Sequence, residues 1–193
     1  MALKVRHLKI GNHPAALELI PDRFGDERGF FSETYNKAEL EKIGVDLDFI
    51  QDNHSLSAEA GTVRGLHFQI PPFAQTKLVR VVKGSVFDVA VDIRKNSPTF
   101  GRHVSLVLSA KTWNQILVPE GFAHGFCTLE RDTEVIYKVN APYSKEHDKG
   151  ILWSDPVLEI DWPQVNGDYT ISEKDKIQPR LSDLPDYFEY IQP

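Results

Sequence analysis

The segment KLVRVVKGSVFDVAVDI (residues 77–93) decides the fold class, because it contains two short apolar runs on either side of a turn signal. Residues 78–82 and 86–93 are rich in valine, a β-branched residue that favours strands. Between them, residues 83–85 (Lys-Gly-Ser) are interpreted as a hairpin turn. The segment therefore predicts a β-rich fold in which these two strands pair.

The second of these strands has two chemically different faces. Its odd-numbered positions, from Phe87 to Ile93, are apolar and share one face, whereas Asp88, Ala90 and Asp92 share the other. In a closed barrel one face must look into the lumen. The pattern is equally compatible with Asp88 in the lumen and in solvent, and we expect Asp92, near the strand end, to face solvent.

Turn signals separate further short strands along the chain. They are predicted over residues 103–109, 114–119, 125–129 and 134–139. This spacing is typical of an all-β sandwich or barrel. The N-terminal third contains extended pieces, which are expected to extend a sheet of the same chain or of a partner. From about Pro163 onward, prolines, acidic residues and aromatics mix without a period, which predicts an arm wrapped over the barrel.

One helix is predicted, over residues 36–44, with Asn36 as N-cap, Glu39 in the capping-box position and Gly44 at its C-terminal end. No repeat or linker divides the 193 residues, so a single domain is expected. The fold class is therefore mainly β: a jelly-roll-like β-barrel with a few short helices and a C-terminal arm.

Composition excludes several function classes. The chain has 22 Lys+Arg against 28 Asp+Glu, a net charge of -6, and no run of cations longer than two, which argues against nucleic-acid binding. No apolar run is long enough to span a bilayer, and the N-terminus lacks a signal-peptide pattern. The single cysteine, Cys127, excludes an intramolecular disulfide. A cytoplasmic protein without a membrane partner is expected.

Three histidines raise the question of a metal site. His67 lies in the strand-like stretch VRGLHFQ (63–69), and His54 and His124 lie in polar, glycine-bounded surroundings. Imidazole is the commonest ligand of zinc and iron, so a metal-dependent enzyme that uses these three residues is one alternative. The familiar metal signature of β-barrels has a second histidine two positions away, where this chain has Gly65 and Gln69. A metal is therefore not the favoured interpretation.

A series of motifs points to one family. They are GDERGFFSETYN (25–36), QDNHS (51–55), RGLHFQ (64–69), residues 74–101, VPEGFAHGF (118–126), EVIYK (134–138), ILWSDP (151–156) and SEKDK (172–176). In order and spacing, from about residue 15 to 181, the chain resembles the dTDP-4-dehydrorhamnose 3,5-epimerases, metal-free enzymes of the cupin superfamily. The resemblance implies one cupin-like epimerase domain over residues 1–193 and no cofactor.

The implied reaction is the epimerisation of dTDP-4-dehydro-6-deoxy-D-glucose at C3 and C5 to dTDP-4-dehydro-L-rhamnose. The motifs are shared by 3- or 5-epimerases of other dTDP-deoxysugar pathways, so a single-site epimerase is an alternative. The C4 ketone acidifies the C3 and C5 protons, and the reaction needs a base, an enolate stabiliser and an acid on the opposite face. By resemblance these are His67, Lys77 and Tyr137 in turn.

A catalytic imidazole also needs a carboxylate to orient it. Asp175 matches the family partner of His67, and Asp88 on the possible lumen face is the second candidate; the sequence does not separate them.

The resemblance assigns further residues to substrate binding. Arginine and lysine suit the diphosphate and nucleotide, and polar side chains suit thymine, ribose and sugar. The implied contacts are Arg28, Arg64 and Lys174 for the first group and Glu33, Gln51, Asp52, Asn53 and His124 for the second. One further contact is expected in YSKEHDKG (143–150), where either Glu146 or Asp148 stands for the family glutamate.

The resemblance finally implies a homodimer. In this family the N-terminal segment of one chain contributes to the sheet and site of the other. An extended N-terminal arm with a strand pattern also needs a sheet edge to pair with.

Overall fold

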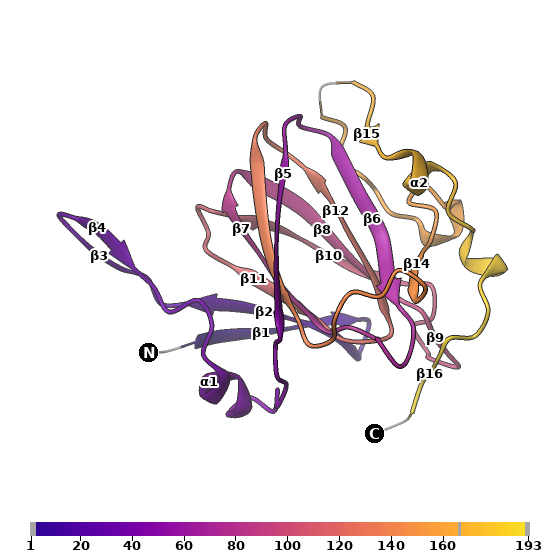
Figure 1. Ribbon diagram of the computed structural model, residues 1–193, viewed down its shortest axis with the longest axis horizontal. Helices are drawn as coiled ribbons and strands as arrows, with labels where there is room; N and C mark the ends of the chain where they lie inside the picture. The colour runs from indigo at the N-terminus through magenta and orange to yellow at the C-terminus, as the bar shows by residue number, and fades with distance from the viewer. Residues whose placement is uncertain (1–2, 166, 192–193) are drawn as a thin grey trace.

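The computed structural model describes residues 3–165 and 167–191 and consists of two facing β-sheets with an arm along one side (Figure 1). The first sheet contains, in spatial order, β1 (Leu3–Ile10), β2 (His13–Pro21), β11 (Gln115–Val118), β7 (Lys77–Lys83), β13 (Thr133–Val139) and β5 (Gln51–Ser57). The second contains β10 (His103–Ser109), β8 (Ser85–Asp92), β12 (Phe122–Thr128), β6 (Thr62–Gln69) and β14 (Asp148–Gly150), with β15 (Thr170–Ile171) also paired to β6. The mainly β, jelly-roll architecture is confirmed, although the sheets are not closed into a continuous barrel.

The remaining elements are short. Two small ribbons are formed by β3 (Phe24–Asp26) with β4 (Gly29–Phe31), and by β9 (Arg94–Lys95) with β16 (Phe188–Glu189). The helical elements are α1 (Lys37–Glu41), α2 (Glu173–Lys176) and the 3-10 turns η1 (Pro156–Leu158) and η2 (Leu181–Asp183). Across the described ranges, none of these helices has the length and hydropathy needed to cross a bilayer.

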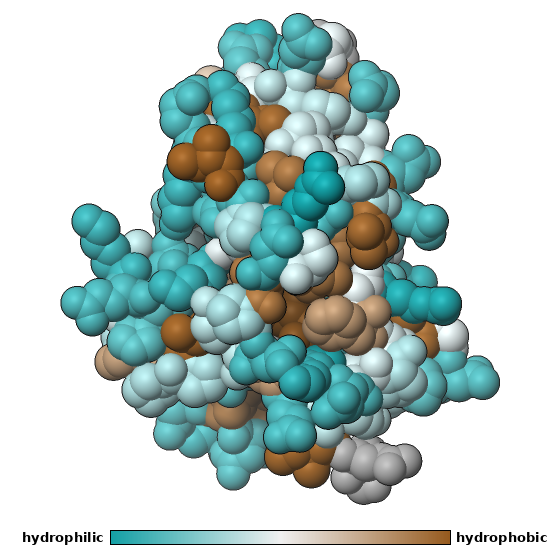
Figure 2. Space-filling view, turned by 90° about the vertical axis from the view of Figure 1, so that its right-hand side faces the viewer, coloured by the Kyte–Doolittle hydropathy of each residue, from teal (hydrophilic) through white to brown (hydrophobic). Residues whose placement is uncertain are grey.

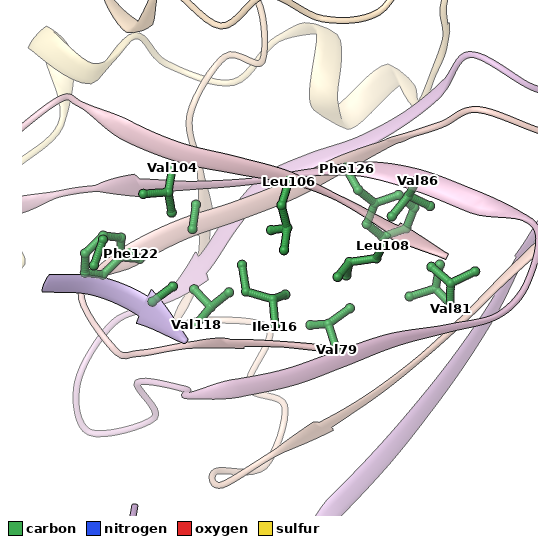
Figure 3. Packing of buried hydrophobic residues seen from close by; sticks show 14 of the residues in the cluster. Val79, Val81, Val86, Val104, Leu106, Leu108, Ile116, Val118, Phe122 and Phe126 are labelled. Carbon is green, nitrogen blue, oxygen red and sulfur yellow. The ribbon is translucent and has the colours of Figure 1, made fainter. Parts of the chain in front are cut away.

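The main core lies between the two sheets. Val79 and Val81 of β7 and Ile116 of β11 meet Leu106 and Leu108 of β10 there, all of them buried (Figure 3). Alternation along each strand places these aliphatic side chains on the inner faces. This packing holds the two sheets at a fixed separation.

The predicted hairpin at residues 83–85 is wrong. β7 pairs with β11 and β13, whereas β8 pairs with β10 and β12, so the turn carries the chain from one sheet to the other. Gly84 has a φ of +78°, and a Cβ there would lie 2.4 Å from Oγ1 of Thr133. A glycine with positive φ permits a tight turn between sheets as readily as within one, so the turn signal does not identify the partner strand.

Asp92 corrects a second expectation. It is fully buried and does not face solvent. It accepts hydrogen bonds from Nε and the terminal guanidinium nitrogen of Arg94, at 2.9 and 2.8 Å, and from the hydroxyls of Ser97 and Thr99, both at 2.6 Å. The residues that follow the strand fold back over its end and satisfy the carboxylate, which compensates its burial. Asp88 is also fully buried, on the inner side of the sheet.

The predicted helix is present but shorter. Asn36 caps α1 and accepts a hydrogen bond from the backbone N–H of Glu39, as expected, whereas the helix ends at Glu41. Gly44 follows with a φ of +84° and turns the chain out of the helix. Leu40 packs against the outer face of the first sheet, with Leu78 and Leu117.

Both ends of the chain behave largely as the sequence predicts. β1 and β2 extend the first sheet of the same chain, and the β3–β4 ribbon projects away from the body (Figure 1). The C-terminal arm runs along the second sheet, where β15 adds a parallel strand to β6 and β16 pairs with β9. On this side of the molecule hydrophilic side chains surround smaller hydrophobic groups (Figure 2).

Candidate active site

A cavity of about 490 Å³ opens between the two sheets, beneath the C-terminal arm. β6 and β12 of the second sheet, β7 and β13 of the first sheet and the segment around α2 all contribute to its walls. Its ionisable side chains are those of Arg64, His67, Lys77, His124, Tyr137, Lys174 and Asp175. Residues that lie far apart in the sequence therefore meet in one polar cavity.

His67 is held by the arm. Its Nε2 lies 2.6 Å from Oδ1 of the buried Asp175, which α2 carries to the cavity. Ser172 caps α2 by accepting from the N–H of Asp175, and the N–H of Gly65 donates to Oδ2 of Asp175 at 3.4 Å. Because the carboxylate accepts from Nε2–H, the lone pair of a neutral ring is on Nδ1. The dyad thus presents one basic nitrogen to the cavity.

The charge state of Asp175 fits this pairing. Burial alone would raise its pKa, but the hydrogen bond and charge of His67, together with the N–H of Gly65, outweigh burial and lower the pKa. Asp175 therefore stays ionised and can stabilise an imidazolium on His67.

The second carboxylate candidate has another partner. Asp88 accepts from Nε2 of His124, with both oxygens at 2.9 Å, and does not contact His67. His124 lies directly opposite His67 in the register of β12 and β6. The cavity therefore contains two neighbouring imidazoles, each with its own buried carboxylate.

Lys77 brings a cation to the backbone of one member of this pair. It lies at the start of β7, and its Nζ donates to the backbone carbonyl of His67 at 3.3 Å. Burial lowers the pKa of Lys77 to about 8, and the negative charges of Asp148 and Asp88 partly oppose this shift. A half-buried ammonium that lines the cavity is a strong electrostatic partner for an anion that forms there.

Tyr137 faces the cavity from the other sheet. It lies on β13, whereas His67 lies on β6, so the two side chains enter the same space from opposite walls. Burial raises the pKa of Tyr137, with Arg64 opposing the shift. The phenol therefore keeps its proton at neutral pH.

Polar groups surround the mouth of the cavity. Arg64 donates to Oγ of Ser57 at 3.1 Å and to the carbonyl of Leu56 at 3.0 Å. Lys174 forms an ion pair with Asp148 at 2.5 Å. Of the two alternatives in residues 143–150, Asp148 is thus the one whose side chain contacts the ionisable groups at this rim.

Several of the expected binding residues do not reach this cavity within one chain. Arg28 lies in the β3–β4 ribbon, pairs with Asp26, and has a side chain that is 84% exposed. Glu33 accepts from Asn36 beside α1, and Asp52 forms an ion pair with Lys138 at 2.8 Å.

Gln51 and Asn53, the two neighbours of Asp52 on β5, lie closer to the cavity. Gln51 and Asn53 alternate with Asp52, so they share the inner face with the cavity-lining Ser55. Gln51 donates to Asn53 at 2.9 Å and accepts from the N–H of Tyr143 at 3.2 Å.

The three histidines do not form a metal site. His54 bonds to Glu134 at 2.9 Å and is on the outer face of β5, away from His67 and His124. In the described ranges no three His, Cys, Asp or Glu side chains are grouped so as to hold a metal ion. The structure therefore contradicts the metal alternative built on these residues.

Two glycines, Gly65 and Gly125, set the geometry of the histidine pair, a role that the motifs did not predict. A Cβ on Gly65 would lie 2.6 Å from Cα of Gly125, so the backbones of β6 and β12 approach more closely than side chains permit. Gly65 also has a φ of +127°. The signal was present in the sequence, as a glycine two residues before His67 and one directly after His124.

Comparison with known proteins identifies the same chemistry. Residues 12–183 match the family described as dTDP-4-dehydrorhamnose 3,5-epimerase. A curated dTDP-4-dehydrorhamnose 3,5-epimerase of Sinorhizobium fredii is 54% identical over 92% of this chain and 91% of its own length.

Solved structures agree with this match. The epimerase of Bacillus anthracis, crystallised with TDP and PPi bound, is 53% identical with a TM-score of 0.86 over 93% of this chain and 99% of its own. The 3,5-epimerase of Legionella pneumophila, in complex with dTDP-4-keto-L-rhamnose, is 37% identical with a TM-score of 0.92 over 99% of this chain and 100% of its own. The chain belongs to the dTDP-4-dehydrorhamnose 3,5-epimerase family, whose members are isomerases of the cupin-like fold.

Proposed function

We propose that this protein epimerises dTDP-4-dehydro-6-deoxy-D-glucose at C3 and C5 and so forms dTDP-4-dehydro-L-rhamnose. The observation that supports this most directly is the placement of His67 with Asp175 on one wall of the cavity and Tyr137 on the opposite wall. Inversion of a carbon requires a base on one face and an acid on the other, which is the arrangement that two facing sheets provide.

The first half of the reaction is deprotonation. Nδ1 of His67 removes the proton from C3 or C5, and the electron pair moves through the carbon–carbon bond to the C4 oxygen. Asp175 stabilises the imidazolium that results. The ammonium of Lys77 stabilises the enolate oxygen, in a buried environment where this interaction is stronger than in water.

The second half returns a proton from the opposite side. The phenol of Tyr137 delivers its proton to the carbon, the C4 ketone re-forms, and the centre is inverted. Because burial raises the pKa of Tyr137, the phenol carries the proton that this step consumes. His67 then releases its proton to solvent and the Tyr137 phenolate takes one from solvent, so both groups are restored before the second carbon reacts. These steps use only side chains of the protein, so no cofactor is included in the proposal.

The nucleotide end of the substrate is assigned to the rim. Arg64 and Lys174 line the mouth of the cavity and bring positive charge to a protein with net charge -6. Arginine binds phosphate oxygens with two parallel hydrogen bonds, so we assign Arg64 to the diphosphate. His124, Asp148, Gln51 and Asn53 are assigned to the sugar and nucleoside.

The rest of the binding set is assigned to a partner chain. Arg28 and Glu33 lie away from the cavity of their own chain, in and after the projecting β3–β4 ribbon (Figure 1). We propose a homodimer in which this N-terminal segment completes the partner's site, with residues 1–193 as one domain per chain, in the cytoplasm. Asp52 is left out of both assignments, because its side chain is on the outer face of β5 and pairs with Lys138.

The test is proton NMR of dTDP-4-dehydro-6-deoxy-D-glucose in deuterium oxide with the purified protein. Deuterium at both C3 and C5, with the L-rhamno product, is the expected result. Deuterium at one carbon would instead support a single-site epimerase, and no exchange at either would contradict the proposal. His67→Asn is the control, since removal of a general base costs about 10²–10⁴ in rate.

A further inference from the structure

The inner face of β8 carries a carboxylate that the proposed steps leave without a role. Asp88 is fully buried and does not line the cavity, and its oxygens contact the cavity-lining His124. Burying a carboxylate without need is costly, since the charged form loses its hydration. Between its polar end residues, Ser85 and Asp92, the other residues of the strand are apolar.

The first clue to its role is geometric. Both oxygens of Asp88 lie 2.9 Å from Nε2 of His124, so the carboxylate accepts one N–H with both of its oxygens. This contact fixes the orientation of a ring that lines the cavity and leaves its other nitrogen, Nδ1, outside the contact with Asp88. His124 is 7% exposed and is otherwise enclosed by the packing of β12.

The second clue is charge. Lys77 and Asp88 lie on inner faces of opposite sheets, and the negative charge of Asp88 is one of two that favour the ammonium form of Lys77. The other, Asp148, is already paired with Lys174 at 2.5 Å. Burial raises the pKa of Asp88, whereas the charge and hydrogen bond of His124 and the charge of Lys77 oppose this shift and favour the ionised carboxylate.

We propose that Asp88 is a positioning residue for the epimerisation: it orients His124 toward the substrate and supplies the buried negative charge that keeps Lys77 cationic for enolate stabilisation. This inference rests on the proposed function. Asp88 acts through its two neighbours and does not touch the reacting atoms.

Other ionisable groups face the same space and must be considered in any pH profile. They are Arg64 and His67 of β6, His124 of β12, Tyr137 of β13, Asp148 of β14 and the α2 pair Lys174 and Asp175. Of these, Asp148 is the only further carboxylate that raises the pKa of Lys77. A change at Asp88 that leaves Asp148 in place therefore removes one of the two carboxylate charges that favour the ammonium form of Lys77.

The experiment compares Asp88→Asn with Asp92→Asn. Both residues are fully buried carboxylates of the same strand, but Asp92 bonds to Arg94, Ser97 and Thr99 at the strand end, outside the cavity. The readout is kcat/KM from about pH 6 to about pH 10, with thermal unfolding measured for each variant. Asp88→Ser is a second neutral variant, and Asp88→Glu restores the charge.

The fall of kcat/KM at high pH is the basic limb of the profile. In Asp88→Asn and Asp88→Ser this limb should move to lower pH by about one unit, a shift typical of losing one nearby opposite charge. Asp88→Glu should keep the limb at the wild-type position even if its rate is lower. Asp92→Asn should unfold at lower temperature with the limb unmoved. A limb that coincides in wild type and both neutral Asp88 variants would overturn the inference.

The outcome is distinguishable from failure of the proposed function. If the wild-type protein does not exchange C3 or C5 protons, the proposed reaction is wrong and this inference fails with it. If the wild type epimerises and only the limb shift is absent, the reaction stands and Asp88 has a structural role only.

Discussion

At the scale of single residues, Lys77 combines two opposed requirements. It has to be cationic to stabilise an enolate, yet the partial removal of water at the start of β7 disfavours the charge and lowers the pKa of Lys77 to about 8. An environment that destabilises the free ammonium strengthens its interaction with a developing anion, because both effects come from the loss of water. The residue is therefore effective only over a limited pH range.

The pH dependence of Lys77 can be predicted with its sign. As pH rises through about 8, Lys77 loses its proton and kcat/KM should fall. Stability should change in the other direction: the unfolded chain binds the proton more tightly, with an ordinary pKa of 10.5, so this group's contribution to the free energy of unfolding increases between about 8 and 10.5. Rate profiles and urea unfolding over the same pH range measure both quantities.

Lys77→Arg is the matched control for this profile. Its guanidinium stays charged at high pH, so the basic limb near pH 8 should disappear even if the rate is lower. A limb that persists unchanged in Lys77→Arg would assign it to another group.

Tyr137→Phe separates proton removal from proton delivery. The variant keeps His67 and Lys77 but lacks the acid on the opposite wall, so the enolate should be reprotonated by His67 on the original face. Deuterium should then enter C3 or C5 without inversion, and the epimerisation rate should fall by about 10²–10⁴. NMR of the recovered sugar measures incorporation and configuration together. Inversion at an undiminished rate would remove Tyr137 from the mechanism.

The main cavity residues could be predicted from the sequence because a short motif is recognised from neighbouring residues alone. His67, Lys77 and Tyr137 were named from short motifs, and the structure does bring them to one cavity. The choice between Asp88 and Asp175 as partner of His67 could not be made, because it depends on how the C-terminal arm folds over the second sheet. That is a long-range contact, and nothing in the spacing of 108 residues between His67 and Asp175 encodes it.

At the scale of elements, the loop after β8 shows how a buried charge can stabilise a strand end. Asp92 gathers donors from Arg94, Ser97 and Thr99. Burial alone would raise its pKa, but these hydrogen bonds outweigh burial and lower the pKa.

The strands themselves were predicted well from alternation, whereas the sheet to which β8 belongs was not, because a turn signal gives no information about pairing partners.

Asp92→Asn should destabilise the fold at neutral pH. The variant replaces charge-assisted hydrogen bonds by weaker ones and turns an amide N–H₂ toward donors, at a cost of about 1.5–3 kcal/mol. The wild-type contribution should be present above the ordinary pKa of 3.8 and be lost as pH falls below it, because the folded-state pKa is lowered. Urea unfolding at neutral and acidic pH measures this.

An exposed ion pair in the same region gives the control. Lys95 pairs with Asp186, and both side chains are at least half exposed. Asp186→Asn should change the free energy of unfolding by less than about 1 kcal/mol, as is usual for surface pairs. Equal losses in the two variants would mean that burial of Asp92 is not what makes it important.

At the scale of the whole molecule, the β3–β4 ribbon is difficult to explain in a single chain. It projects from the body and carries Phe30 and Phe31, which are 52% and 64% exposed, beside the exposed Arg28 (Figure 1). Exposed aromatic side chains close together typically mark a surface that another protein covers. The sequence predicted extended N-terminal pieces, but whether they serve the same chain or a partner is a property of the assembly.

A mixed-dimer experiment tests whether Arg28 serves the partner's cavity. Arg28→Ala and His67→Asn should each be nearly inactive alone. In a heterodimer of the two variants, one site combines the wild-type His67 of the first chain with the wild-type Arg28 of the second, and the other site carries both substitutions. Random mixing gives half heterodimers with one intact site of two, so about a quarter of wild-type activity should return in a two-fold symmetric assembly. The assay mixes co-expressed or co-refolded chains and confirms dimers by light scattering. A mixture no more active than its separate components would mean that each ribbon serves its own chain or neither.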